Sequence, residues 1–212
     1  MSRKLWMERV RGTQIASDAA FDRLVPQHIR HLSAVHWTPL DVAVRVAVLL
    51  APAAHERVLD VGSGIGKLCI IGAMSSQGIW CGVEKCNPLV VCARKLAQEL
   101  GVAARTQMIY GDIFALDWAT YDALYFFNPF ETAMSGRTSD RKWELSYPVA
   151  SAEAQRRLAL LRPGTRVVTL NGFGGVMPPT FRILLRETIA RFDTELVVWL
   201  QTDTPEKSTW QS

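Results

Sequence analysis

Long apolar segments are missing from this 212-residue sequence. The longest apolar run, Val46–Ala54, contains a proline and falls far short of the roughly 20 residues that cross a bilayer as a helix. The basic start, MSRKLWMERVRG, is followed by neither an apolar signal core nor a cleavage site. We therefore expect a cytoplasmic protein with no membrane partner.

Cysteines are few, and their spacing argues against a metal site. Cys69, Cys81, Cys86 and Cys92 form no Cys-x-x-Cys pair and have no nearby histidine. Tetrahedral zinc sites need cysteine or histidine pairs at short spacing, so we expect no bound metal. Cys69, Cys81 and Cys92 lie among apolar residues, which favours a role as small core residues.

The chain also lacks a strong excess of charge. Its net charge is +4, hydrophobic residues make up 49% and charged residues 21%. These values are typical of a globular protein with one sizeable core. The basic residues are scattered and not interleaved with aromatics, and the length leaves no room for a target-recognition domain, so nucleic acid is the less favoured partner. We expect a monomer or a weak dimer.

Apolar strand-like segments alternate with helical ones along most of the sequence. Strands are expected at residues 57–61, 79–84, 106–110, 123–127 and 166–170, separated in part by helices at 65–74, 88–100 and 151–161. Residues 181–189 and 195–201 then follow each other with no helix between them. This order predicts an α/β fold: a doubly wound, seven-stranded, mostly parallel sheet with an antiparallel C-terminal hairpin, plus short N-terminal helices.

The sequence also marks the start and end of an N-terminal helix, one long irregular stretch and the expected boundaries of the main domain. Thr38 can cap a helix that has Pro39 at its first position and Pro52 at its end. Residues 131–147 form a long irregular stretch, and such loops are often functional. We expect an N-terminal helical extension over residues 1–36, the main domain over 37–205 and a tail over 206–212.

The stretch VLDVGSGIGK, residues 58–67, is consistent with three kinds of ligand. A phosphate loop for ATP needs glycine where Val61 stands and serine or threonine where Leu68 stands, which excludes it. A dinucleotide fingerprint needs its third glycine at the position of Lys67. The remaining ligand is S-adenosylmethionine, whose methionine part suits a loop with alternating glycines that lets the backbone approach it closely. These glycines are Gly62, Gly64 and Gly66.

Polar residues close the next strands, as expected for a ligand at the carboxyl edge of a parallel sheet. Glu84 can accept hydrogen bonds from both ribose hydroxyls, although a nicotinamide cofactor would use it equally. Asp112 can accept from an adenine amino group, with Ile113 against the ring. Asn128 can accept from a substrate amine, and Phe130 can flank the group presented to the sulfonium.

The motifs VLDVGSGIGK, GVEK, GDI and FFNPF, in this order and spacing, resemble those of class I S-adenosylmethionine-dependent methyltransferases over roughly residues 37–201. The resemblance implies a Rossmann-like fold, methyltransferase activity and S-adenosylmethionine as cofactor. HWTP is similar to the Thr-Pro element of amino-group methyltransferases, where Thr38 would touch the cofactor's carboxylate; a plain helix cap is the alternative. The cofactor-binding residues implied are Thr38, Asp60, Gly62, Gly64, Gly66, Glu84, Lys85, Asp112, Ile113 and Asn128.

Two branches of that family resemble the chain, so the acceptor stays open. Amino methyltransferases of DNA and protein glutamine carry Asn/Asp-Pro-Pro-aromatic, whereas this chain has Asn-Pro-Phe, one proline short. Non-SET histone lysine methyltransferases share the Gly-Ser-Gly-x-Gly loop, Gly-Val-Glu-Lys, and an asparagine followed by phenylalanine. The interpretation leans to a protein-lysine-type amine or a small molecule. The alternatives are an adenine N6-type nucleic-acid methyltransferase and a cofactor-binding protein without transfer activity.

Asn128 and Phe130 are the expected catalytic residues, because methyl transfer to an amine depends mostly on positioning. Trp143, Tyr147 and Phe173 are candidate walls of the acceptor pocket, with ordinary packing as the alternative role of each. A nicotinamide reductase would need a Tyr-x-x-x-Lys pair near the fourth strand, and that spacing is missing. His36 is the histidine nearest to the expected site, and a plain polar role is favoured for it.

Overall fold

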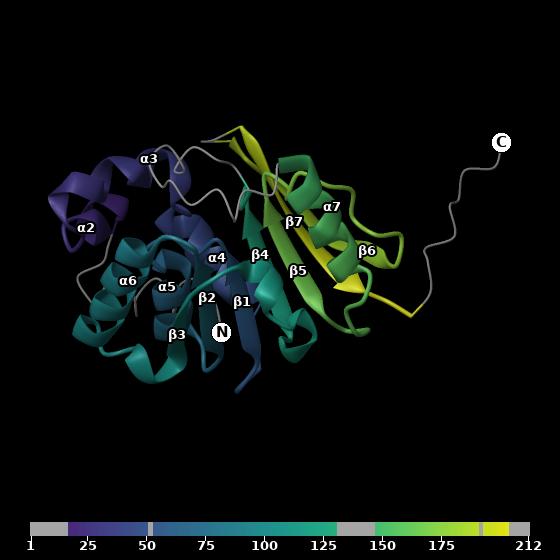
Figure 1. Ribbon diagram of the computed structural model, residues 1–212, viewed down its shortest axis with the longest axis horizontal. Coiled ribbons are helices and arrows are strands. Elements are labelled where there is room, and N and C mark those ends of the chain that lie inside the picture. Colours follow the sequence, from purple (N-terminus) through teal and green to yellow (C-terminus); the bar gives the residue numbers. More distant parts are fainter. Residues whose placement is uncertain (1–16, 51–52, 131–146, 191–192, 204–212) are drawn as a thin grey trace. The chain divides into compact units, whose positions relative to one another are not determined.

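The computed structural model describes residues 17–50, 53–130, 147–190 and 193–203 (Figure 1). The strands of these residues are β1 (Arg57–Val61), β2 (Ile79–Glu84), β3 (Thr106–Tyr110), β4 (Ala123–Phe127), β5 (Arg166–Leu170), β6 (Phe181–Ile189) and β7 (Thr194–Gln201). They form one seven-stranded sheet in the order β3-β2-β1-β4-β5-β7-β6, with β6 and β7 antiparallel. This topology confirms the expected α/β fold. By compactness the chain divides into two units, Met1–Leu116 and Asp117–Ser212.

In the first unit, β1, β2 and β3 pair in parallel. Helices α4 (Leu40–Leu50), α5 (Lys67–Ser75) and α6 (Asn87–Glu99) accompany them, and α5 and α6 lie beside β2 and β3 (Figure 1). The β1 strand is buried from Val58 to Val61, as its continuous apolar sequence predicts. Parallel pairing brings the carboxyl ends of β1 and β2 to one edge, and the glycine-rich loop leaves the sheet there.

Helix α5 is buried along nearly its whole length, because its sequence KLCIIGAMS is apolar on all sides. Gly72 in its middle lies against Trp80 of β2. A Cβ at Gly72 would come within 2.2 Å of the Trp80 ring, so the helix can lie flat on the strand only without one. This close packing fixes the start of α5, and with it the end of the glycine-rich loop.

The N-terminal helices of the first unit are α2 (Asp18–Asp22), a 3₁₀ helix η1 (Gln27–Leu32) and α3 (Ser33–His36). Ser17 caps α2, with its hydroxyl oxygen accepting from the Ala20 N–H at 3.2 Å. Phe21 and Val25 are buried. Short N-terminal helices are therefore present as expected, while the domain boundaries given above stay predictions.

In the second unit, β4 and β5 pair in parallel, β7 pairs antiparallel with β5, and β6 pairs antiparallel with β7 around an irregularity between Ile183 and Leu185. A row of aromatic rings lies beside β4: the Phe126 ring centroid is 5.7 Å from that of Trp118 and 5.7 Å from that of Phe173. Trp118 belongs to a short 3₁₀ helix, η4 (Trp118–Thr120).

Helix α7 (Tyr147–Leu158) begins four residues earlier than the expected 151–161. Pro148 lies in its first turn, where proline has no helical partner to lose and its fixed φ suits the helix. Ala150, Ala154 and Leu158 recur at helical spacing and are buried. The Arg157 guanidinium lies 5.7 Å from the Trp118 ring centroid, which joins α7 to the aromatic row.

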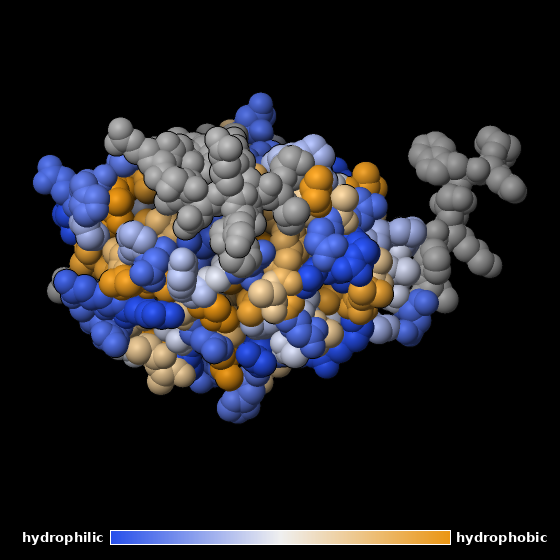
Figure 2. All heavy atoms as spheres, in the orientation of Figure 1, coloured by the Kyte–Doolittle hydropathy of each residue, from blue (hydrophilic) through white to orange (hydrophobic). Residues whose placement is uncertain are grey.

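No helix among the described residues combines the length and the apolar character that a membrane crossing requires. On the face shown in Figure 2, hydrophilic and hydrophobic residues are interspersed.

Candidate cofactor site

The glycine-rich loop after β1 has left-handed backbone at three alternating positions. The φ angles are 75° at Gly62, 54° at Gly64 and 69° at Gly66. Residues with a Cβ adopt such angles only at a cost, so the alternation of glycines in the sequence follows from the backbone path. The N–H groups of Gly62 and Ser63 both donate to the Val83 carbonyl, at 3.1 and 3.0 Å, which fixes the loop on β2.

Two of these glycines also lie close to neighbouring side chains. A Cβ at Gly66 would come within 2.5 Å of the Met108 Cε, so glycine is needed there for packing as well as for its φ. A Cβ at Gly64 would lie 3.7 Å from the indole of Trp37, which is buried. Trp37 was missed as a site residue by the sequence analysis, although it immediately precedes Thr38 in HWTP. The contact brings the HWTP element to the glycine-rich loop.

Glu84, at the end of β2, joins the loop to the start of α6. Its Oε2 accepts from the Gly64 N–H at 3.0 Å, and its Oε1 accepts from the Cys86 N–H at 2.8 Å. A carboxylate offers about four lone-pair positions, so each oxygen can still accept a second hydrogen bond. The residue is half-buried, and the adjacent Lys85 is exposed. Glu84 can therefore hold a pair of ligand hydroxyls while it braces the loop.

Asp60, the last acid before the loop, is turned into the protein. Only 5% of its surface is exposed, and it accepts a weak hydrogen bond from the Cys69 thiol at 3.7 Å. Burial raises the pKa of Asp60 to about 7, with a further raising effect from the Glu84 charge and an opposing one from the Cys69 hydrogen bond. Near neutral pH, Asp60 is therefore poised between its two protonation states beside the loop.

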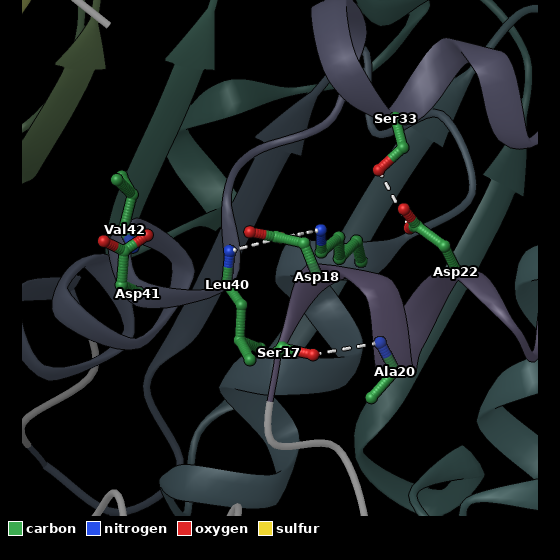
Figure 3. A network of polar contacts seen from close by, with 9 residues as sticks. Ser17, Asp18, Ala20, Asp22, Ser33, Leu40, Asp41 and Val42 are labelled. Atoms are coloured by element: carbon green, nitrogen blue, oxygen red, sulfur yellow. Dashed lines mark hydrogen bonds and ion pairs between the residues drawn. The ribbon is translucent and has the colours of Figure 1, made fainter. Parts of the chain in front are cut away.

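The start of α4 is held by a residue far away in the sequence. The Leu40 N–H donates to Asp18 Oδ1 at 2.8 Å, and Figure 3 shows this bond from α2 to α4. The same oxygen lies 2.5 Å from Lys67 Nζ, at the first position of α5. The Lys67 ammonium is also 5.3 Å from the Phe21 ring centroid. Asp18 thus ties α2 to the start of α4 and to the start of α5, the helix that follows the glycine-rich loop.

This contact adds to the sequence expectation for the start of α4. Thr38 was expected to cap the helix; Thr38 is buried, and Asp18 is the side chain that accepts from the Leu40 N–H. Pro39 does begin the helical hydrogen bonding, since its carbonyl accepts from the Ala43 N–H at 2.8 Å. The role of Thr38 toward the cofactor stays a prediction.

Asp112 and Ile113 follow β3 at the same edge of the first unit's strands. Asp112 caps the short 3₁₀ helix η3 (Ile113–Ala115), and its Oδ1 accepts from the Phe114 N–H at 2.9 Å. The Gly111 N–H donates to the Glu84 carbonyl at 3.1 Å. The expected ribose and adenine residues therefore lie on adjacent strand ends that are hydrogen-bonded to each other.

In the second unit, Asn128 follows β4 with a left-handed φ of 44°. Asn128 and Phe130 are both half-buried. Phe173 is buried against Phe126, which fits the packing role held open for it, and Tyr147 is 38% exposed at the start of α7. Trp143 lies outside the described residues, as do residues 131–146 of the irregular stretch expected over 131–147; its last residue, Tyr147, begins α7.

No protein-family model matches the sequence, and no curated protein matches it by sequence similarity. Solved structures do share its fold. An RNA methyltransferase from Salinibacter ruber, in complex with S-adenosyl-L-homocysteine, has a TM-score of 0.58 at 23% identity, covering 82% of this chain and 99% of that one. A mutant of MtNAS in complex with S-adenosylmethionine has a TM-score of 0.57 at 18% identity, covering 94% and 72%. The cyclase SpnF has a TM-score of 0.56 at 14% identity, covering 77% and 80%.

These likenesses confirm the Rossmann-like fold that the sequence motifs imply, a fold that the RNA methyltransferase from Salinibacter ruber has. A shared fold at such identities does not assign an activity, because one fold hosts many functions.

Proposed function

We propose that the protein is an S-adenosylmethionine-dependent methyltransferase that acts on an amino group. The observation that carries the proposal is the hydrogen bond from the Gly64 N–H to the Glu84 carboxylate. This bond joins a loop shaped by three left-handed glycines to an acid that can accept further hydrogen bonds. S-adenosylmethionine is a nucleoside attached to an amino acid: the loop backbone would bind the amino-acid part, and the acid would bind the ribose hydroxyls. The neighbours solved with S-adenosylmethionine and S-adenosyl-L-homocysteine support the choice of cofactor.

We assign residues of the first unit to the separate parts of this cofactor. The first N–H groups of α5 have no acceptor within the helix and favour a carboxylate at its N-terminus. Glu84 would accept from the ribose hydroxyls, Asp112 from the adenine amino group, and Ile113 would lie against the ring. Asp60, Gly62, Gly64, Gly66, Thr38 and Lys85 complete the proposed set.

In the second unit we assign Asn128 to the acceptor, with Phe130 beside it. When bound, S-adenosylmethionine supplies a methyl group on a positive sulfur: the amine lone pair forms the N–C bond, the C–S bond breaks, its electrons stay on sulfur, and the surplus proton passes to water. The amide oxygen of Asn128 can accept from the amine N–H and so direct the lone pair. No strong base is required, since the amine reacts in its neutral form.

We favour a protein-lysine-type amine as acceptor, because GVEK and the asparagine followed by phenylalanine resemble that branch, or a small molecule. The Salinibacter neighbour is an RNA methyltransferase, so an adenine N6-type acceptor is the second candidate. SpnF, a cyclase by its name, motivates the third, a cofactor-binding protein without methyl transfer. A cytoplasmic location and a monomeric or weakly dimeric state stay predictions.

Two experiments test this function. Calorimetry should detect binding of S-adenosylmethionine and S-adenosyl-L-homocysteine, and none of NAD or ATP; tight NAD binding alone would overturn the proposal. Incubation with methyl-labelled S-adenosylmethionine and host lysate should then place label in protein or in small molecules. Label in nucleic acid would support the second candidate, and cofactor binding with no label anywhere would support the third.

A further inference from the structure

Two asparagines leave the sheet side by side in the second unit. β4 and β5 are parallel neighbours, and Phe127 of β4 is paired with Leu170 of β5 at the carboxyl end. The next residues are Asn128 and Asn171, so both leave at one level on strands about 4.8 Å apart. The sequences are parallel as well: Phe-Asn-Pro-Phe over 127–130 and Leu-Asn-Gly-Phe over 170–173.

Both asparagines have left-handed backbone, with φ of 44° at Asn128 and 59° at Asn171. Asparagine tolerates this region better than other residues with a Cβ, but glycine adopts it without strain. The chain uses glycine for this purpose at the neighbouring Gly172 and Gly174, with φ of 71° and 82°. At position 171 the chain therefore has an asparagine where glycine would also allow the turn, and this places an amide at the carboxyl end of β5.

The loop that holds Asn171 is fixed on both sides. The Asn171 N–H donates to the Glu195 carbonyl of β7 at 2.9 Å. Gly174 lies so close to the first residue of α7 that a Cβ there would come within 2.2 Å of the Tyr147 hydroxyl. Between them, Phe173 is buried against Phe126. Asn171 itself is exposed, so its amide sits on a fixed backbone and is accessible to a ligand.

We propose that Asn171 is a second acceptor-orienting residue, paired with Asn128; this rests on the amino-group methyltransferase function proposed above. A neutral primary amine has two N–H groups and one lone pair. Two amide oxygens can accept from both N–H groups, which leaves the lone pair as the free direction of the nitrogen. In the transfer the lone pair forms the N–C bond, the methyl–sulfur bond breaks with its electron pair staying on sulfur, and the surplus proton passes to water.

The proposed pair of asparagines predicts that loss of Asn171 affects the first and the second methyl transfer differently. An amine that already carries one methyl group has a single N–H when neutral, so one asparagine suffices to hold it. Loss of the Asn171 amide should therefore slow the first transfer more than the second, and the ratio of dimethylated to monomethylated product should rise. A purely structural role of Asn171 would lower both transfers together.

The test compares Asn171→Gly with Asp193→Gly, another left-handed residue of the same unit, whose φ is 47°. Glycine keeps the left-handed backbone at both positions and removes only the side chain. Both variants, Asn171→Asp and the wild type are incubated with methyl-labelled S-adenosylmethionine and host lysate. Total label and the separated mono- and dimethylated products are measured, together with melting temperature and cofactor affinity.

We expect Asn171→Gly to transfer label at least tenfold more slowly, with a raised dimethyl-to-monomethyl ratio and with unchanged melting temperature and cofactor affinity. Asn171→Asp keeps an acceptor of the same shape and should retain most of the transfer, and Asp193→Gly should match the wild type. Wild-type transfer by Asn171→Gly, or a loss with an unchanged product ratio, would overturn the inference. If the wild type itself bound the cofactor but labelled nothing, the proposed function would fail first and take this inference with it.

Discussion

The Glu84 carboxylate and the Gly64 backbone are hydrogen-bonded at 3.0 Å, which couples the end of β2 to the loop after β1. The acid proposed to hold the ribose therefore also shapes the loop proposed to hold the methionine part. Loss of this one side chain should affect both halves of the cofactor site.

Glu84→Ala should weaken S-adenosylmethionine binding by about 1.5–3 kcal/mol, because it removes charge-assisted hydrogen bonds. Calorimetry on the folded variant measures the loss. Glu99→Ala, which removes an exposed glutamate on α6, is the matched control and should bind as the wild type does. Equal affinity of Glu84→Ala and the wild type would make the ribose assignment wrong.

Asp60→Asn should change how stability depends on pH. Its folded pKa of about 7 lies above the 3.8 usual for an aspartate side chain, so the folded state holds a proton that the unfolded state releases between these values. Protonation of Asp60 therefore stabilises the folded wild type at low pH, and this stabilisation is lost as pH rises from about 4 to 7. The difference in free energy of unfolding between variant and wild type should shift in the variant's favour from pH 5 to pH 8. A difference that stays constant over that range would show that Asp60 ionises normally.

The Asp18–Lys67 pair should be strongly coupled. Lys67 is 3% exposed and Asp18 is 25% exposed. Asp18→Ala therefore leaves a buried cation without its carboxylate partner and should cost about 2–3 kcal/mol, below the roughly 3–5 of fully buried pairs. In a double-mutant cycle with Lys67→Met, the double variant should lose less stability than the sum of the single variants. Additive losses in urea unfolding would mean that the two charges do not interact.

Gly66→Ala and Gly101→Ala separate backbone strain from crowding. Their φ angles are nearly equal, 69° and 70°, but a Cβ at Gly66 would meet Met108 at 2.5 Å, whereas nothing described lies within 4 Å of one at Gly101. Gly101→Ala should cost about 1–2 kcal/mol from strain alone, and Gly66→Ala about 1–3 kcal/mol more from overpacking. Thermal unfolding of the two variants measures the difference; equal losses would mean that Met108 moves aside freely.

The strands could be predicted from the sequence because buried parallel strands are short apolar runs between turn residues. Residues 57–61, 79–84, 106–110, 123–127, 166–170 and 181–189 form strands with the expected bounds. Helix α7 begins earlier than the sequence predicts, because Pro148 lies in its first turn, where a proline is compatible with a helix. Local signals thus fix most elements to within a few residues.

Part of the candidate site could be predicted from the local sequence, and part of it could not. The left-handed glycines follow from local sequence, since few other residues allow the path. The hydrogen bond from the Leu40 N–H to Asp18 joins residues 22 positions apart. The contact of Trp37 with Gly64 depends on how the HWTP element packs against the glycine-rich loop. No local pattern encodes either contact, so only the structure could reveal them.

The strand order of the second unit has a consequence for folding during synthesis. β6 precedes β7 in the chain, but β7 lies between β5 and β6 and is the neighbour through which β6 joins the sheet. As the chain emerges from the ribosome, β6 therefore stays without its partner until residues 194–201 are free. In this interval the edge of β5 and the whole of β6 expose unpaired backbone, which is the state in which a nascent chain is most prone to wrong strand pairing.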